Sequence, residues 1–496
     1  MTRLTRRQFL LGTVAAGVGA SACTRQSSPA PTLVNDVHSQ LNPTRVDRVV
    51  PIDSVETLRR LIRDARDEGK AISIAGGRHA AGGQQFGAGM ILADMTPMNR
   101  VLDFDPVRGA IEVEAGIQWP ALIDSTLRAQ TGQRRPWGII QKQGVDRISI
   151  GGTLSANAHG SGLGLKPFIG DVEAFTLCDA EGRLHRCDRR RNTELFRLAI
   201  GGYGLFGVVT SVRLRLAPRR VLQRVVELTD VERLVPILET RTREGFLYAN
   251  FQSMTDAHSE GFLRQGVLTC YRPADDRAPA PAERQELSAD TWKRLVSLAH
   301  TDKSRAFQIY AGGLLATSGR TCWSDTHQLA TYVDGYHRWL DGQLGAAHPG
   351  SEMLVEFFVP RPVLAAFLAD VRKDFLDHDV DLIFGTIRVA EQDDESVLAW
   401  ARWPAACVVF NIHVTHTPEG FISAAATFQR LVDLVIRQGG TYYLTYHRFA
   451  SRAQVEARHP RLGQFLKSKQ AYDPQERFGS DWYRHYAALL TEIDLR

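Results

Sequence analysis

Six glycines lie between residues 76 and 89, inside the segment AISIAGGRHAAGGQQFGAGMILADMTPMN (residues 71–99). Short β-type runs, residues 71–74 and 90–93, flank them, and His79 lies in the middle. Glycine at this density frees φ for positive values and lets the backbone approach a ligand closely. Successive amides in such a turn can form a nest for anionic phosphate oxygens. No G-x-G-x-x-G opens a helix here, so the segment is not the dinucleotide fingerprint.

Two later segments add to this signal. Residues 148–164 read ISIGGTLSANAHGSGLG, and residues 199–210 read AIGGYGLFGVVT. Together the three segments resemble the FAD-binding domain of the vanillyl-alcohol oxidase superfamily. Its segments read like G-R-G-H-S followed by a glycine and glutamine, then V-G-G-T-L-S-x-A, then G-G-x-G-x-F-G-V-I-T. The resemblance covers residues 46–218 strongly and the remainder more faintly. It extends to alditol and aldonolactone oxidases, cytokinin dehydrogenase and decaprenylphosphoryl-ribose oxidase.

The resemblance implies an α+β fold and FAD as cofactor. We expect a PCMH-type FAD-binding domain of two subdomains over residues 46–218. A substrate domain with an antiparallel sheet flanked by helices would follow over residues 219–460. Residues 461–496 would pack back on the FAD-binding domain, because Asp473 and Phe478 match the family's D-P-x-x-x-F block; an ordinary C-terminal helix is the alternative. The FAD contacts implied are Gly76, Gly77, Arg78, His79, Ala80, Gln84, Ser149, Gly152, Ser155, His159, Gly160 and Val209.

His79 is the residue expected to carry the cofactor covalently. Relatives with a G-H-S stretch attach the flavin 8α-methyl carbon to this histidine, whereas Ala80 stands here where serine is usual. A hydrogen-bonding His79 beside non-covalent FAD is the alternative. A second tether is not expected, because residues 144–147 read GVDR where other members have a G-V-C-P-like stretch. His159 either lies beside the flavin, as a similar histidine-glycine pair does in decaprenylphosphoryl-ribose oxidase, or is a structural histidine.

Three residues of the second domain are candidates for catalysis: Glu356, Arg388 and His447. Flavin takes a hydride from a carbon bearing a hydroxyl or amine, and the protein must hold that carbon and remove the heteroatom proton. Alternation over residues 354–360 points Glu356 away from the face of its neighbours. Arg388 lies in T-I-R, which resembles the E-I-R of alditol and aldonolactone oxidases, with Thr386 replacing the acid. Each candidate has a structural alternative, an exposed charge on a sheet face or a capping histidine.

Hydrophobic periodicity predicts the following elements. Helices are expected over residues 55–68, 119–130, 192–198, 230–241, 290–318, 362–377 and 420–438. Strands are expected over 110–115, 208–216, 221–228, 248–253, 353–359, 407–413 and 440–446, with a hairpin over 171–187 and a surface loop over 272–286.

The N-terminus is typical of an export signal. Thr5 to Leu10 matches the twin-arginine pattern, a mild apolar run follows, and Ala20-Ser21-Ala22 resembles a cleavage site. We expect residues 1–22 to be removed and the protein to reach the periplasm. Cys23 follows directly, so lipidation of Cys23 is the one route by which a membrane would be a partner. Residues 23–45 are predicted to be a flexible linker.

Composition excludes some classes of function. The chain has 496 residues, 44% hydrophobic and 23% charged, which suits about three globular domains. The formal charge of +5 includes three arginines of the export segment, so no nucleic-acid partner is expected.

Cys178 and Cys187 flank a turn and are either a pair or two buried thiols. No C-x-x-C occurs, and His413 and His416 fall on opposite strand faces, so no metal is expected.

Three functions follow from these features. The first is an exported flavoprotein that oxidises a CH–OH group of a polar, carbohydrate-like small molecule, with O₂ as acceptor. The second is a flavin dehydrogenase that passes electrons to a quinone or another carrier. The third, a redox-inactive periplasmic binding protein, is disfavoured by the glycine turn with His79.

Overall fold

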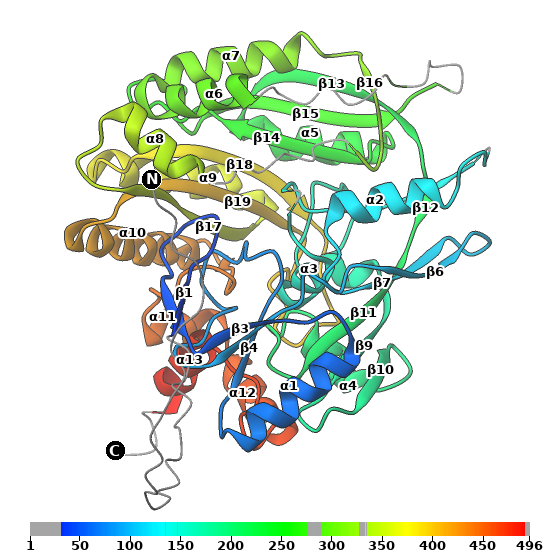
Figure 1. The fold of residues 1–496 in the computed structure, drawn as a ribbon. Helices are drawn as coiled ribbons and strands as arrows, with labels where there is room; N and C mark the ends of the chain where they lie inside the picture. Colours follow the sequence, from blue (N-terminus) through cyan, green and yellow to red (C-terminus); the bar gives the residue numbers. More distant parts are fainter. Residues whose placement is uncertain are drawn as a thin grey trace, which may run out of the picture. The chain divides into compact units, whose positions relative to one another are not determined.

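The computed structural model describes residues 31–133, 135–145, 147–275, 281, 289–326, 333 and 335–491. The export segment, Cys23 and most of the loop predicted over 272–286 lie outside these residues. From Pro31 onward the chain forms one compact unit of helices and sheets (Figure 1). The predicted α+β class is confirmed, with one small parallel sheet and larger antiparallel ones.

Folded structure begins earlier than the sequence pattern predicts. β1 (Thr32–Val34) pairs antiparallel with β2 (Thr44–Val46). In the loop between them, Asp36 accepts hydrogen bonds from backbone amides of residues 38–40, and Asn42 donates to the carbonyl of Ala81 at 2.6 Å. The predicted linker is therefore wrong for residues 32–45. Its polar composition indicates a loop, but these side chains satisfy the backbone and fix the loop against the glycine turn.

The first subdomain is a parallel sheet with the strand order β3-β5-β4 (Arg48–Pro51, Ile91–Asp94 and Ile72–Ala75). α1 (Val55–Asp67) connects β3 to β4 and buries Leu58, Leu61, Ile62 and Ala65 against the sheet. Ser54 caps this helix by accepting from the amide of Thr57. The glycine turn follows the carboxyl end of β4, as the sequence predicts.

The second subdomain is a five-stranded antiparallel sheet with the order β10-β9-β11-β7-β6. These strands are Leu184–Asp188, Val172–Cys178, Val208–Arg215, Ala110–Glu114 and Val101–Asp105. The other elements of this part are α2 (Trp119–Arg128), β8 (Trp137–Gly138), α3 (Ile150–Ala156), η1 (Phe168–Gly170), α4 (Thr193–Ala199) and β12 (Ala217–Pro218). Cys178 pairs across β9 and β10 with Leu184, and Cys187 with Phe175, so both cysteines are buried free thiols.

The third sheet has eight antiparallel strands in the order β16-β13-β15-β14-β18-β19-β17-β20. They span Thr321–Trp323, Val221–Asp230, Gln265–Pro273, Tyr248–Ser253, Leu382–Ala390, Ala405–Thr415, Gly350–Pro360 and Thr441–Tyr442. One face carries apolar residues such as Phe251, Ile387 and Phe357, which belong to the main hydrophobic core. The other face carries the polar residues that alternate with them.

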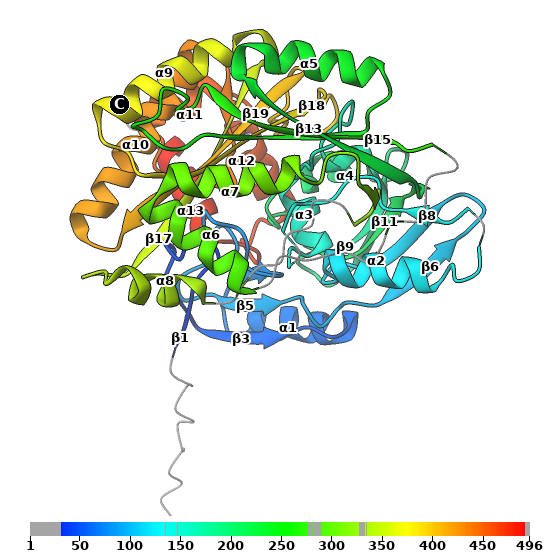
Figure 2. The same ribbon diagram turned by 90° about the horizontal axis from the view of Figure 1, so that it is seen from above.

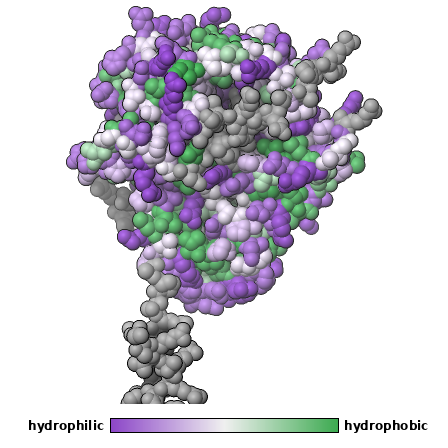
Figure 3. Space-filling model, turned by 45° about the horizontal axis from the view of Figure 1, so that its top comes forward, coloured by the Kyte–Doolittle hydropathy of each residue, from purple (hydrophilic) through white to green (hydrophobic). Residues whose placement is uncertain are grey.

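Helices cover both faces of this sheet. α5 (Val231–Arg243), α9 (Leu364–Asp377) and α10 (Pro418–Arg437) pack over the apolar face. α6 (Ala289–Thr301), α7 (Lys303–Leu315) and α8 (Tyr336–Leu344) lie over the opposite face (Figure 2). No helix of the described residues is both long and apolar enough to cross a membrane. On the face in Figure 3, hydrophobic side chains are scattered among hydrophilic ones.

The C-terminal segment contacts the first subdomain. After α11 (Arg452–Arg458) and α12 (Leu462–Tyr472), the chain pairs with β4 through a bridge between Phe478 and Ile72. The Arg477 guanidinium donates to the carbonyl oxygens of Ala65 and Lys70. α13 (Asp481–Thr491) follows.

Three predicted elements differ from the structure. Residues 290–318 form two helices, because Asp302 caps α7 through the amide of Arg305. The loop predicted from residue 272 begins later, since residues 272 and 273 end β15. The strand predicted over 440–446 is only β20, and β15 and β18 were not predicted at all. The hydrophobic runs of β15 and β18 are interrupted by polar residues that line a cavity, namely Thr269, Thr386 and Arg388.

Candidate active site

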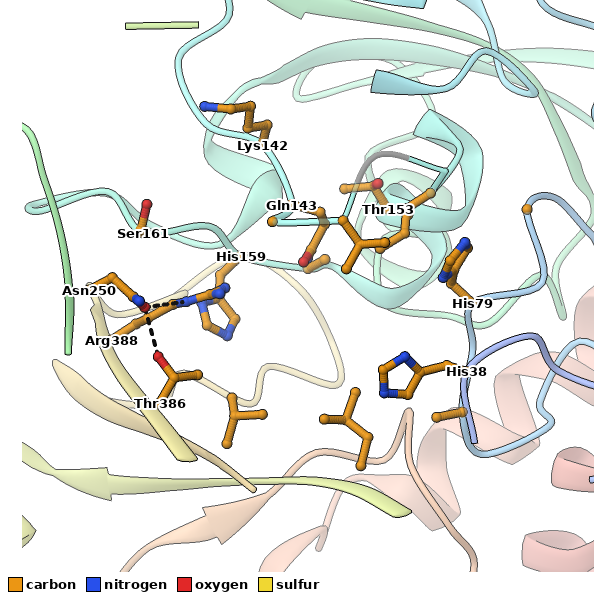
Figure 4. A pocket seen from close by; sticks show the side chains of 18 of the residues that line it. His38, His79, Lys142, Gln143, Thr153, His159, Ser161, Asn250, Thr386 and Arg388 are labelled. Carbon is orange, nitrogen blue, oxygen red and sulfur yellow. Dashed lines mark hydrogen bonds between the residues drawn. The ribbon is translucent and has the colours of Figure 1, made fainter. Parts of the chain in front are cut away.

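A cavity of about 1760 Å³ lies between the glycine turn, α3 and the polar face of the eight-stranded sheet. Figure 4 places His79 on one side of it and His159, Asn250, Thr386 and Arg388 on the other. Small-molecule sites are usually about 300–1,000 Å³. The cavity is therefore large enough for an extended cofactor together with a substrate.

The glycines of the turn let different parts of the chain meet at this cavity. A Cβ on Gly76 would lie 2.1 Å from Ser149 Oγ, and one on Gly77 would lie 2.0 Å from the carbonyl oxygen of Arg147. A Cβ on Gly82 would lie 2.1 Å from the carbonyl oxygen of Tyr446. The glycine turn can thus approach both the segment before α3 and the chain after β20. The many glycines therefore let other segments of the chain, as well as a ligand, come close to the backbone of the turn.

The structure brings most of the predicted cofactor residues to one cavity. Arg78 adopts a left-handed conformation (φ +59°) directly before His79, a backbone state that non-glycine residues seldom adopt. The predicted residues that line the cavity are Gly76, Gly77, Arg78, His79, Ala80, Gln84, Ser149, Gly152, Ser155, His159, Val209, Glu356 and Arg388. Their roles toward a cofactor stay predictions.

Two neighbouring glutamines give the cavity wall polar atoms without partners in the described chain. Gln84 and Gln85 are 6% and 7% exposed and both line the cavity. Gln84 donates to Thr445 Oγ1, but its Oε1 and both polar atoms of the Gln85 amide have no hydrogen-bond partner within the described chain. Buried polar groups are nearly always paired in folded proteins. A large polar molecule with donors and acceptors, such as FAD, fits this wall.

A histidine-carboxylate pair lies on the opposite wall. Glu356 comes from β17 and His159 from the segment after α3, and the side chains are 4% and 5% exposed. The Nε2 atom of His159 is 2.6 Å from Oε1 of Glu356, and its Nδ1 atom is 3.0 Å from the carbonyl oxygen of Gly160. A carbonyl only accepts, so Nδ1 carries a hydrogen and the short contact at Nε2 holds one further shared proton.

The second oxygen of Glu356 accepts a single, long hydrogen bond among the described residues. Tyr446 donates to Oε2 over a long 3.3 Å, so Oε2 is held less tightly than Oε1. Burial and the neighbouring Glu356 carboxylate raise the pKa of Tyr446 well above its usual value. Tyr446 therefore stays a protonated donor to Oε2, and Glu356 is one of the residues that line the cavity.

Aromatic side chains fix the imidazole of His159 from behind. The ring of Trp400 lies 5.0 Å from it and stacks on Phe358 at 4.1 Å. Trp400 also donates through Nε1 to the carbonyl oxygen of Asn157, and Tyr443 donates to the carbonyl oxygen of Ala156. The pair with Glu356 is thereby held in a rigid, water-poor environment.

Asn157 ends α3 in a left-handed conformation (φ +48°) two residues before His159. Its side chain accepts from the amide of Ile169 at 3.0 Å and donates to Asp393 at 2.8 Å. Asn157→Ala should lower the free energy of unfolding by about 1–3 kcal/mol for each buried partner left unpaired. Denaturant unfolding measures this change. In the matched control, Asn192→Ala, the residue is exposed with φ +49°, so the loss should stay below about 1 kcal/mol. Equal losses of unfolding free energy in the two variants would contradict the buried structural role of Asn157.

A second polar group lies beside the pair, on β14 and β18. Arg388 Nε donates to Asn250 Oδ1 at 3.2 Å, and Thr386 Oγ1 donates to the same oxygen at 2.8 Å (Figure 4). Strand pairing places Asn250 next to Arg388, because Phe251 lies opposite Ile387. The Arg388 guanidinium lines the cavity and is suited to orient an oxygen-rich molecule.

Two predicted residues are not among those lining the cavity. His447 is buried, stacks on Phe449 at 5.3 Å, and has a pKa lowered to about 3 by burial and by the charges of Arg448 and His38. Gly160 packs instead on Lys142, whose carbonyl oxygen would lie 2.5 Å from a Cβ there. Glu356 and Arg388 line the cavity, whereas His447 does not, and its catalytic role stays a prediction.

Asn250 and Tyr446 were missed by the sequence analysis. Asn250 could have been found, since it and Gln252 are the polar alternate positions of a correctly predicted strand. Tyr446 follows β20 in an irregular segment, where alternation says nothing about direction. No local signal pairs it with Glu356.

Comparison with known proteins covers the part of the chain that contains the glycine turn. Residues 46–188 match the model of a family described as FAD binding domain. L-gulonolactone oxidase of Bos taurus is 26% identical over 46% of this chain and 48% of its own length. Cytokinin dehydrogenase 9 of Oryza sativa subsp. japonica is 25% identical over 50% and 53%. The mitochondrial L-galactono-1,4-lactone dehydrogenase 2 of the same plant is 28% identical over 38% and 32%.

The chain spans about half the length, or less, of these curated relatives. The matched segment contains the glycine turn, His79, α3 and His159. The expected cofactor, FAD, is confirmed. Residues 46–188 are an FAD-binding domain of the vanillyl-alcohol oxidase superfamily.

Proposed function

We propose that this protein is an FAD-dependent oxidoreductase of the aldonolactone oxidase and dehydrogenase type, acting on a CH–OH group of a polar, carbohydrate-like small molecule. The observation that carries the proposal is the buried His159–Glu356 pair facing the glycine turn across one cavity. A redox-inactive binding protein has no need of a carboxylate held in this way. Bound FAD supplies the acceptor for the hydride.

The chain's own residues supply binding and proton transfer. Arg388 and Asn250 orient the oxygens of the substrate from the sheet face. Glu356 Oε2 accepts the hydroxyl proton, while His159 holds Oε1. The aromatic cluster of Phe358, Trp400 and Tyr443 keeps water from the back of the pair. Gly76, Gly77 and the residues around Ser149 hold the cofactor.

A panel of aldonolactones, alditols and sugars, added without oxygen to the purified flavin-loaded protein, tests this function. We expect at least one compound to bleach the flavin absorbance. Bleaching by none of the oxygen-rich alcohols, with bleaching by an amine instead, would contradict the proposed CH–OH donor.

The electron acceptor of this protein is a separate question, because the relatives include both oxidases and dehydrogenases. We propose O₂ as the acceptor, with a quinone or other carrier as the second candidate. After anaerobic bleaching, air should restore the yellow colour within seconds if O₂ is used. Bleaching that persists in air until a quinone is added identifies a dehydrogenase.

Export to the periplasm through the twin-arginine pattern of Arg6 and Arg7 is part of the proposal. Changing both residues to lysine should leave unprocessed precursor in the cytoplasm, because the export signal is then lost while its charge is kept. Cell fractionation measures this, with Arg3→Lys as the matched control. An unchanged periplasmic yield from the double variant would refute export by this route. Mass spectrometry of the exported chain would show whether Cys23 is lipidated.

A further inference from the structure

A second group of titratable side chains lies on the same sheet face, away from the His159–Glu356 pair. Glu352 precedes Glu356 by four residues on β17, roughly 13 Å along the strand. His413 lies directly opposite Glu352 on β19, and His300 reaches the same point from the end of α6. His300 and Glu352 line the cavity, and neither takes part in the proposed redox chemistry.

The three side chains converge closely. His300 Nε2 is 3.2 Å from Glu352 Oε1, and both side chains are 4% exposed. The His300 and His413 rings lie 5.1 Å apart at 88°. One ligating atom from each of the three residues lies within 4.8 Å of the others. Ligands about 2.0–2.1 Å from a tetrahedral ion are separated by roughly 3.3 Å, so a small inward movement would complete such a site.

Hydrogen bonding leaves this group incomplete. His300 Nε2 and His413 Nδ1 are buried and have no hydrogen-bond partner of correct geometry among the described residues. Glu352 Oε2, in contrast, accepts from the Tyr336 hydroxyl and lies 3.3 Å from Nδ1 of His337. Oε2 is therefore held by neighbours, whereas Oε1 is directed at His300. Buried nitrogens without partners beside a carboxylate need a physical explanation, and a bound cation is one that fits this group.

We propose that His300, Glu352 and His413 bind a divalent transition-metal ion of the zinc type. Two imidazoles and one carboxylate are a ligand set that zinc takes in proteins, with a fourth position open to water or a ligand. Here that position faces the cavity, because His300 and Glu352 line it. Tyr336 and His337 orient Glu352 as outer partners of the ligand. The ion would link α6 to β17 and β19 and would offer a Lewis acid to an anionic group in the cavity.

This proposed site departs from the sequence-based expectation of no metal. That expectation considered His413 with His416, three residues apart on one strand. The structure gives His416 a different partner, since its Nε2 atom is 2.7 Å from Ser351 Oγ. The proposed ligands come from three elements that are distant in the sequence, so no local spacing reveals them.

Zinc binding to the flavin-loaded protein tests the proposal. The protein is stripped with a chelator, incubated with ZnCl₂ and desalted, and zinc and FAD per chain are measured. We expect about one zinc per chain for the parent. Glu352→Gln and His413→Gln should each lose it, and Tyr336→Phe should bind about 10- to 100-fold more weakly. His416→Gln is the matched control and should retain zinc, since Ser351 already occupies its ring nitrogen.

FAD content and the metal-free melting temperature show whether each variant is folded, and both must match the parent. If a variant fails this check, X-ray absorption at the zinc edge of the parent protein identifies the ligands of the ion directly. Two imidazoles and an oxygen at about 2.0–2.2 Å support the site, and a sulfur at about 2.3 Å would place the ion at the other candidate group, His159, Glu356 and Cys407. No zinc retained by the parent, or full retention in folded Glu352→Gln and His413→Gln, would overturn the proposal.

Discussion

Glu356→Gln is expected to slow substrate-driven reduction of bound FAD about 10²- to 10⁴-fold, the usual contribution of a positioned general base. The amide keeps the volume of the side chain but cannot accept the hydroxyl proton. It can still accept from His159 through its carbonyl oxygen, so the surrounding structure should be retained. Anaerobic stopped-flow absorbance at a saturating substrate concentration measures the rate directly.

The matched control for this variant is Glu114→Gln. Glu114 is also buried and also charge-paired, to Arg100 at 2.7 Å, but it belongs to β7 and is not among the residues lining the cavity. Its reduction rate should stay within about twofold of the parent, well below one kcal/mol in barrier. A Glu356→Gln protein that keeps its FAD and reduces at the parental rate would remove Glu356 from the proposed chemistry.

His79→Ala is expected to abolish covalent attachment of the flavin. His79 lines the cavity directly after the left-handed Arg78, at the turn where relatives with G-H-S attach their cofactor. The parent protein, denatured in acid and run on a denaturing gel, should give a fluorescent band that the variant lacks. Attachment needs the flavin held in place first, and the glycine turn provides that wall.

His159→Asn is the matched control for attachment, because His159 also lines the cavity but pairs with Glu356 on the opposite wall. It should keep the fluorescent band and lose activity. A dark parental band with a yellow supernatant would show that FAD is bound without a link. A band lost only in His159→Asn would move the attachment point to the other histidine.

The fold was predictable where one local rule decides the structure. The glycine turn after β4 and the cap of α1 at Ser54 follow from turn and capping chemistry alone. Alternation in β17 predicts that Glu356 lies on the other face of the sheet from Val355 and Phe357. The structure agrees, since Val355 and Phe357 belong to the core and Glu356 lines the cavity. The side of the sheet on which a catalytic group lies can therefore be inferred from a single strand.

Pairing between distant segments was not predictable. Glu356 and His159 are 197 residues apart, and nothing in either segment indicates that the two side chains form a pair. The position of His447 was also not predictable, because β20 ends at Tyr442 and the chain continues to His447 in an irregular segment. Asp302 divides α6 from α7 through one capping hydrogen bond inside a run that is helical throughout. Each case depends on tertiary contacts that override a local pattern.

We propose that FAD and a CH–OH substrate meet in the cavity between the glycine turn and the His159–Glu356 pair. A crystal structure of the flavin-loaded protein tests it most directly. We expect the dimethylbenzene edge of the flavin ring beside His79 and the N5 side facing Glu356, with the phosphates along residues 76–84 and 149–155. A ring placed on the far side of α3 from Glu356, or a cavity that stays empty while FAD binds elsewhere, would contradict it.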